Sequence, residues 1–344
     1  MRARWIERWD GPLLDGERPK PRPGSGEVLV AVEACGVGLT VLNCIRGNLG
    51  DDPADLPRIP GHELVGTVAE VGPGVDPDWV GRRAMAYFYL LCARCRRCLA
   101  GAESMCERLA GHVGVHRDGG YAEWTVLPER NVVPLPEGIE ATAATVIPDA
   151  IATPVHVAGR ARIRPGERVA VIAAGGGVGI HMVQVARVYG AEVAGLEASA
   201  EKLDYLERVL GVPAADSTDF AGVRLPAGWG DGPDVVVDLL GTEASLEWGL
   251  RTLGPDGRLV LLTTFPGRTV SVSPREMVFR QQTVVASRYA SRSELMFGAR
   301  LVAEERVRPV VGRVAGPGDV DGLHDALRRG DLLGRGALTW TDRQ

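Results

Sequence analysis

The chain has 344 residues, 45% of them hydrophobic, and a formal net charge of −5. This length suggests two domains, and the hydrophobic fraction is enough for large buried cores. A slightly acidic chain with no basic block excludes nucleic acid and an anionic membrane surface as partners. No apolar run approaches the ~20 residues that span a bilayer, and the N-terminal MRARWIERWDGP does not read as a secretory signal. The expected partner is therefore a small molecule.

Residues 1–60 consist of short alternating segments separated by Gly and Pro. This pattern predicts an antiparallel β domain, in which residues 26–32 form the clearest strand.

Four of the six cysteines stand close together, in the spacing Cys92-x2-Cys95-x2-Cys98-x7-Cys106. In a chain without a secretory signal, such spacing favours metal over disulfides. Four thiolates suit a tetrahedral zinc with no open position, which is a structural site. Arg94, Arg96 and Arg97 would offset the negative charge that four thiolates leave on a zinc ion. We expect one structural zinc and a cytoplasmic location.

Residues 168–202 follow the order strand, glycine turn, helix, strand, acid. The apolar residues 169–172 predict a buried strand, and the helix begins directly after the turn. A helix N-terminus can bind a pyrophosphate, and glycines allow the backbone to approach it. The turn residues expected at the cofactor are Ala174, Gly176, Gly177, Val178 and Gly179. Ala174 stands where the G-x-G-x-x-G pattern has its first glycine, and a βαβ unit without a ligand is the alternative interpretation.

Glu197 ends the second strand, about 20 residues after the glycines, where an acid would accept hydrogen bonds from the adenosine ribose. Its charge would repel a 2′-phosphate, and no Arg follows it, so the sequence favours NAD(H) over NADP(H). From residue 165 onward, α/β alternation predicts a parallel sheet, with further strands at 234–238, 258–262 and 283–287. Thr263 follows one of them, at the edge where such sheets bind ligands.

The segment Gly61-His62-Glu63-x2-Gly66-x5-Gly72-x2-Val75 resembles the G-H-E signature of the medium-chain dehydrogenase/reductase family, of the zinc alcohol dehydrogenase type. The four-cysteine segment and Gly119 to Trp124 also match this family, and the resemblance covers essentially the whole chain. It implies an α/β plus β fold with a GroES-like β domain and a Rossmann domain whose parallel sheet is doubly wound.

The boundaries expected from this resemblance are a catalytic domain over residues 1–148, with its zinc lobe at about 92–106, a Rossmann domain over 149–290, and a return to the first domain over 291–344. The family also implies that Thr153 packs by the nicotinamide and that Lys202 lies near the adenosine ribose. Many family members dimerise through the edge of the Rossmann sheet and some form tetramers, so a homodimer or homotetramer is expected.

In this family a catalytic zinc is held by a Cys, by the His of G-H-E, and by a later Cys or Asp. His62 and Asp149 match the second and third ligands, but Gly38 stands at the position of the Cys. A second zinc is therefore doubtful. His62, Glu63 and Asp149 would hold a weakened metal site, or His62 is simply a hydrogen-bonded polar residue. Thr40 is kept, and its hydroxyl could hold a substrate oxygen in the role otherwise taken by a metal.

Three functions follow. The leading hypothesis is a nicotinamide-dependent oxidoreductase that transfers hydride between NAD(P)(H) and an alcohol or carbonyl compound, with Thr40, His62, Glu63 and Asp149 as its catalytic residues. The alternative is zinc-independent 1,4-reduction of a C=C bond conjugated to a carbonyl, because an enolate needs only hydrogen-bond donors. A cofactor-binding protein without turnover is the third hypothesis.

Overall fold

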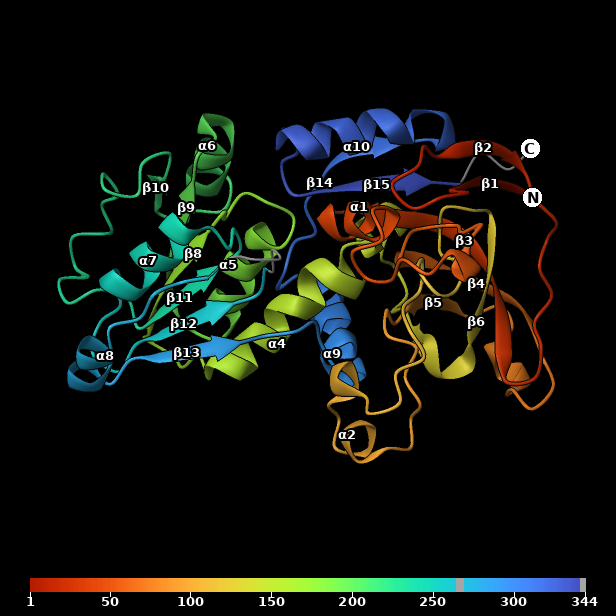
Figure 1. Cartoon of the computed structure of the whole chain (residues 1–344), viewed down its shortest axis with the longest axis horizontal. Coiled ribbons are helices and arrows are strands. Elements are labelled where there is room, and N and C mark those ends of the chain that lie inside the picture. Colours follow the sequence, from red (N-terminus) through yellow and green to blue (C-terminus); the bar gives the residue numbers. More distant parts are fainter. Residues whose placement is uncertain (264–268, 341–344) are drawn as a thin grey trace. The chain divides into compact units, whose positions relative to one another are not determined.

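The computed structural model describes residues 1–263 and 269–340, and these residues form two compact units. The first unit contains residues 1–152, 290–305 and 309–340, and the second contains residues 153–289 and 306–308, apart from the undescribed positions 264–268. Each unit has its own sheet (Figure 1). Within the described residues, no helix is long and apolar enough to cross a membrane.

The first unit is built on a seven-stranded mixed sheet in the order β14-β15-β3-β4-β5-β7, with β6 paired to β3. Only the β14–β15 pair is parallel. Its strands, with the separate β1–β2 hairpin, are β1 (Arg2–Trp5), β2 (Leu14–Glu17), β3 (Glu27–Val37), β4 (Glu63–Val71), β5 (Arg83–Ala86), β6 (Trp124–Pro128), β7 (Val132–Pro134), β14 (Val311–Ala315) and β15 (Arg335–Thr339). β3 is the central strand because almost all of its residues are apolar and buried.

Helices of the first unit are short and cover this sheet or its connections. They are α1 (Leu39–Ile45), α2 (Arg96–Leu99), α3 (Ala141–Ala144), the π-helix η5 (Ile147–Ile151), α9 (Arg292–Ala303) and α10 (Val320–Arg329). Single 3₁₀ turns lie at η1 (Pro53–Asp55), η2 (Pro77–Trp79), η3 (Glu103–Met105), η4 (Glu129–Asn131) and η6 (Pro317–Asp319). The π-helix places Asp149 in its middle, a local irregularity that is frequent at functional sites.

Strand register at the end of β3 brings distant parts of the chain together. Gly36 pairs with Glu63 of β4 on one side and with Ala337 of β15 on the other. The ends of β4 and β15 therefore meet across a segment, Gly36 to Gly38, that has little side-chain volume. This arrangement positions the polar cluster described below.

The second unit has a six-stranded, wholly parallel sheet in the order β10-β9-β8-β11-β12-β13. The strands are β8 (Arg168–Ile172), β9 (Glu192–Glu197), β10 (Ala214–Asp216), β11 (Val235–Asp238), β12 (Arg258–Leu261) and β13 (Thr283–Ala286). The helices are α4 (Ala152–Ala161), α5 (Gly179–Val188), α6 (Ala200–Arg208), α7 (Glu243–Thr252) and α8 (Pro274–Arg280). The chain runs outward in both directions from β8, so the expected doubly wound fold is confirmed (Figure 1).

A buried pair in the first unit makes stability depend on pH. The Tyr121 hydroxyl and His324 Nε2 lie 2.9 Å apart, and both residues are buried. Burial, helped by the charge of Arg328, lowers the pKa of His324 to about 4. Unfolding restores a pKa near 6.5, so the unfolded chain takes up a proton that the folded chain refuses between these values.

We expect the free energy of unfolding to fall as the pH drops through this window, by about 2 kcal/mol between pH 7.5 and pH 5 from this histidine. His324→Gln should remove that share of the dependence. Urea denaturation of both proteins at the two pH values measures it, and parallel pH profiles for the two would contradict the assignment.

Candidate functional site

The glycine turn connects β8 to α5 in the second unit. Gly179 begins the helix so close to the strand end that a Cβ there would lie 2.1 Å from the Ala173 carbonyl oxygen. A Cβ on Gly175 would lie 2.6 Å from the Cβ of Lys202. Both glycines are therefore required by the protein's own packing.

Gly176 differs from these neighbours. A Cβ at this position would meet only the Ala173 carbonyl oxygen, at 3.3 Å, and the backbone is not in the left-handed region. Neither packing nor conformation demands glycine here. Space left open at the N-terminus of a helix is what a pyrophosphate needs, and the turn fits the dinucleotide expected there.

Two backbone N–H groups fix the carboxylate of Glu197 at the end of β9. One carboxylate oxygen accepts a hydrogen bond from the Gly175 N–H at 2.9 Å, and the other accepts one from the Ala198 N–H, also at 2.9 Å. The side chain is 8% exposed, and Lys202 on α6 is buried to the same extent beside the turn. The structure therefore brings Glu197, Lys202 and the glycine turn together at one edge of the sheet.

Other predicted cofactor residues also lie in this unit. The Thr263 hydroxyl donates to the Leu239 carbonyl at 2.8 Å, between the ends of β12 and β11. Asp238 accepts hydrogen bonds from the Leu240 and Gly241 backbone N–H groups and thereby shapes the same edge. Thr153 is buried in α4. Contact of these residues with a cofactor stays a prediction.

The four cysteines of the lobe converge as their spacing predicts. The Sγ atoms of Cys95 and Cys98 lie 3.5 Å apart, those of Cys95 and Cys106 3.9 Å, and those of Cys92 and Cys98 4.0 Å. Tetrahedral zinc with Zn–S bonds of about 2.3 Å holds its sulfurs about 3.8 Å apart. Backbone N–H groups also point at the sulfurs, as from Cys95 to Cys92 Sγ at 3.3 Å. The lobe fits a structural zinc.

His62, Glu63 and Asp149 also come together, inside the first unit. His62 Nε2 lies 3.6 Å from Glu63 Oε1 and 3.6 Å from Asp149 Oδ2, and all three residues are buried. Among the described residues, neither ring nitrogen of His62 has a hydrogen-bond partner. Phe88 packs against the imidazole, with ring centroids 4.3 Å apart.

A fourth residue occupies the middle of this cluster. Arg335, the first residue of β15, donates from Nη2 to Glu63 Oε1 and to Asp149 Oδ2, each at 2.6 Å, and from Nε to Glu63 Oε2 at 3.0 Å. Its side chain is 6% exposed. Burial alone would lower the pKa of Arg335, but the charges of Glu63 and Asp149 outweigh it and raise the pKa above its ordinary value. The guanidinium is a fixed cation.

Gly38 lies against the face of that guanidinium. A Cβ on Gly38 would stand 2.3 Å from Arg335 Cζ and 2.6 Å from each of its two terminal nitrogens. The backbone of Gly38 is extended, with φ −128° and ψ 175°, so any residue could adopt it. Glycine is needed here because the arginine fills the space.

A catalytic metal does not fit this centre. The carboxylates that would bind it already accept hydrogen bonds from Arg335, and the same guanidinium fills the space beside Gly38. A divalent ion placed among these groups would adjoin a buried positive charge, which opposes binding in a low-dielectric interior.

Further polar and sulfur-containing side chains lie on β3 and α1 of the same unit. Thr40 lies half-buried in the first turn of α1, and Asn43 of the same helix accepts a hydrogen bond from Asn48. Cys35 and Cys44 are buried and belong to neither group of potential metal ligands among the described residues. His112 follows the zinc lobe and is buried, because it packs against Phe88 and Tyr89.

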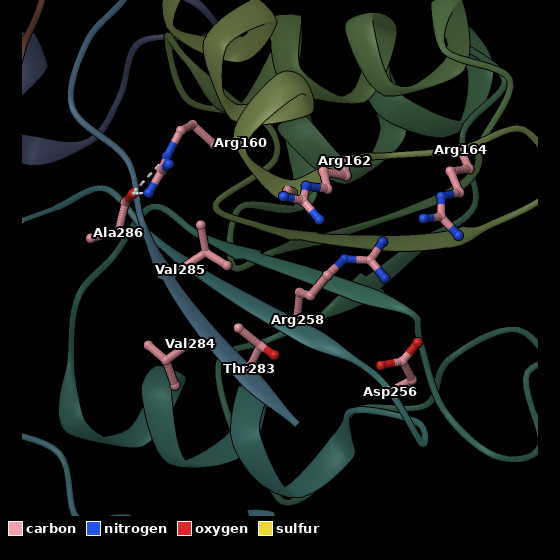
Figure 2. A pocket seen from close by; sticks show the side chains of 10 residues that line it. Arg160, Arg162, Arg164, Asp256, Arg258, Thr283, Val284, Val285 and Ala286 are labelled. Carbon is pink, nitrogen blue, oxygen red and sulfur yellow. Dashed lines mark hydrogen bonds between the residues drawn. The ribbon is translucent and has the colours of Figure 1, made fainter. Parts of the chain in front are cut away.

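A groove of about 490 Å³ lies along β13 in the second unit (Figure 2). Four arginines line it: Arg160, Arg162, Arg164 and Arg258. Two of them interact with other groups of the protein. Arg160 donates a hydrogen bond to the Ala286 carbonyl, and Arg258 forms an ion pair with Glu167 at 2.7 Å. The groove also includes Asp256 and Thr283, at the amino ends of strands. Open α/β sheets bind nucleotides at the opposite ends, so this groove is not the cofactor site.

Comparison with known proteins identifies the family. The model for the alcohol dehydrogenase GroES-like domain matches residues 24–137, and the model for the zinc-binding dehydrogenase domain matches residues 177–304. An alcohol dehydrogenase of Geobacillus stearothermophilus is 31% identical over 341 residues, covering 98% of this chain and 99% of the relative. The chain belongs to the medium-chain dehydrogenase/reductase family, of the zinc alcohol dehydrogenase type. It is an alcohol dehydrogenase-like oxidoreductase.

Two further relatives bear on its chemistry. The crystal structure of an NAD-dependent alcohol dehydrogenase superposes with a TM-score of 0.89 at 32% identity, covering 98% of this chain and 99% of that one. An acryloyl-coenzyme A reductase of Metallosphaera sedula is 27% identical over 325 residues, covering 93% of this chain and 94% of the relative. The family thus contains enzymes named for each of the two predicted reaction types.

Arg335 is the functional residue that sequence reasoning missed. It stands 272 residues after Glu63, in a segment that was expected only to return to the first domain. The sequence feature that could have pointed to it was Gly38. A residue without a side chain inside a buried polar cluster leaves room that another residue must fill.

Proposed function

We propose that this chain transfers hydride between NAD(H) and an alcohol or carbonyl compound at a centre without a catalytic metal. The observation that carries the proposal is the glycine turn with Glu197 at the carboxyl edge of a doubly wound sheet, in a chain of the alcohol dehydrogenase family. When bound, the dinucleotide supplies or accepts the hydride. In the reducing direction, the carbonyl carbon gains this hydride and the oxygen gains a proton, which gives an alcohol.

The protein's part is to hold the substrate oxygen. His62 offers ring nitrogens without another partner among the described residues, and Thr40 offers a hydroxyl. Donors preorganised in a buried site stabilise developing negative charge on oxygen far better than water does. Glu63 and Asp149 already accept hydrogen bonds from Arg335, so their oxygens are engaged by the guanidinium and not by the substrate. We therefore assign the proton donor to His62.

Cofactor preference is expected to depend on the charge of Glu197. Glu197→Gln keeps an oxygen to accept the Gly175 N–H but removes the negative charge, so NADPH should become a better substrate. We expect the ratio of kcat/KM for NADH over NADPH to fall at least tenfold, which corresponds to about 1.4 kcal/mol. Steady-state kinetics with both cofactors measures this. Glu192→Gln, at the exposed opposite end of β9, is the matched control. An unchanged ratio in Glu197→Gln would contradict the assignment.

A second candidate reaction is reduction of a C=C bond conjugated to a carbonyl. It is favoured because Arg335 occupies the space where a metal ion would bind. An enolate oxygen needs only hydrogen-bond donors and no Lewis acid. The relatives named acryloyl-coenzyme A reductase add support. In this reaction the hydride goes to the β carbon and the proton to the α carbon.

One experiment separates the two reactions. The purified protein is incubated with NADH and a cyclic enone, and the products are identified by gas chromatography. An allylic alcohol supports carbonyl reduction, and a saturated ketone supports the second candidate. Saturated ketones, aldehydes and an acryloyl thioester are run in parallel. NADH that binds without oxidation across this panel would refute both reactions.

The exposed edge of the second sheet supports a homodimer as the assembly. β13 is the last strand in the sheet, so one side of it has no strand partner among the described residues. An open edge with Val284 and Val285 is suited to pairing with the same strand of a second copy. The four thiolates of the zinc lobe fit a reducing compartment, and we place the protein in the cytoplasm.

A further inference from the structure

The two carboxylates of the centre need a cation. Glu63 is fully buried and Asp149 is 9% exposed. Ionised carboxylates without a partner are very costly in a protein interior. Arg335 meets this need with three charge-assisted hydrogen bonds of 2.6–3.0 Å, two from Nη2 and one from Nε. One guanidinium therefore compensates the charge of both carboxylates, as a bound metal ion would.

The position of that guanidinium depends on the register of the sheet. β3 lies between β4 and β15, with Gly36 opposite both Glu63 and Ala337. A Cβ on Gly36 would lie 2.5 Å from Glu63 Oε2, just as one on Gly38 would lie 2.3 Å from Arg335 Cζ. Two glycines on the same side of the chain thus make room for the acid and the arginine of one ion pair.

We propose that the guanidinium of Arg335 is the resident cation of the His62–Glu63–Asp149 centre, in the place of a metal ion, and that Gly38 is the residue that admits it. Positions 38 and 335 are then coupled. A side chain at 38 is compatible with a metal or with an empty centre, but not with this arginine. Arg335 is a positioning residue, since it fixes both carboxylates and leaves His62 as the member without a hydrogen bond in the described structure.

Cobalt(II) tests this proposal, because its visible absorption reports a bound ion without any turnover. The zinc-loaded wild type, Arg335→Ala and Gly38→Cys/Arg335→Ala are each titrated with Co²⁺, and each spectrum is read as a difference from that of the same protein before cobalt is added. The zinc-filled cysteine lobe is the same in all three proteins. We expect no additional site in the wild type and one additional equivalent in Arg335→Ala. The double variant should bind more tightly and show a thiolate-to-cobalt band.

Gly38→Ala keeps every charged group and covers the case in which loss of Arg335 prevents folding. Its Cβ must displace the guanidinium, so its melting temperature should fall by about 5 °C or more. Gly316→Ala is the matched control, because Gly316 has φ −78° and open space around its Cβ position. A second cobalt site in the wild type as tight as that of the double variant would overturn the proposal. Equal melting temperatures for the two alanine variants would also overturn it. Neither readout depends on which carbonyl compound the protein reduces.

Discussion

Replacing Arg335 by methionine will lower the free energy of unfolding by about 3–5 kcal/mol. Methionine fills much of the same volume but leaves Glu63 and Asp149 buried without a counter-charge. Removal of one partner from a buried ion pair typically costs this much, because the remaining charge is uncompensated. Urea denaturation followed by tryptophan fluorescence measures the loss. It reports mainly on the first unit, which contains five of the seven tryptophans: Trp5, Trp9, Trp79, Trp124 and Trp340.

Two further variants make this result specific. Arg329 pairs with Asp331 at 2.6 Å on the surface, so Arg329→Met should cost less than about 1 kcal/mol. Combining Arg335→Met with Glu63→Gln and Asp149→Asn removes both uncompensated charges and should recover part of the lost stability. If Arg335→Met is no more destabilising than Arg329→Met, the guanidinium does not hold this centre together.

Changes at Gly176 will weaken NADH binding without weakening the fold. We expect Gly176→Ala to raise the Kd for NADH at least tenfold and Gly176→Val at least a hundredfold, because each added carbon occupies the space assigned to the pyrophosphate. The melting temperature of Gly176→Ala should stay within about 2 °C of the wild type, since its Cβ meets only the Ala173 carbonyl oxygen at 3.3 Å. Fluorescence titration with NADH gives the Kd.

Gly179→Ala is the contrasting variant. Its Cβ would lie 2.1 Å from the Ala173 carbonyl oxygen, so it should lower the melting temperature and weaken NADH binding together. The difference between the two positions separates a glycine required by packing from a glycine required by the ligand. An unchanged Kd in Gly176→Val would show that the dinucleotide does not approach this turn.

Local signals in the sequence were sufficient for the second unit and for the zinc lobe. The strand–turn–helix order of residues 168–202 requires only short-range periodicity, and the structure gives β8, α5 and β9 in that order. The four cysteines stand within 15 positions, so their spacing alone determines that their sulfurs can meet. Features of this kind are encoded by neighbours along the chain.

The polar centre could be predicted only in part. His62, Glu63 and Asp149 were expected together from a family pattern, and the structure places them within reach of one another. Arg335 could not be added, because its position depends on the pairing of β15 with β3, a contact between segments about 300 residues apart. The occupant of a cavity follows from tertiary packing, and a glycine at position 38 indicated only that something had changed.

Zinc per chain, measured by elemental analysis of protein purified without chelators, tests the central claim most directly. A centre that contains Arg335 predicts one zinc, held by Cys92, Cys95, Cys98 and Cys106, with Arg335 in the place of the second. Cys98→Ser should then reduce the zinc content to nearly zero. Two zinc ions per wild-type chain, with one retained in Cys98→Ser, would show that His62, Glu63 and Asp149 bind a metal despite Arg335 and would contradict the account.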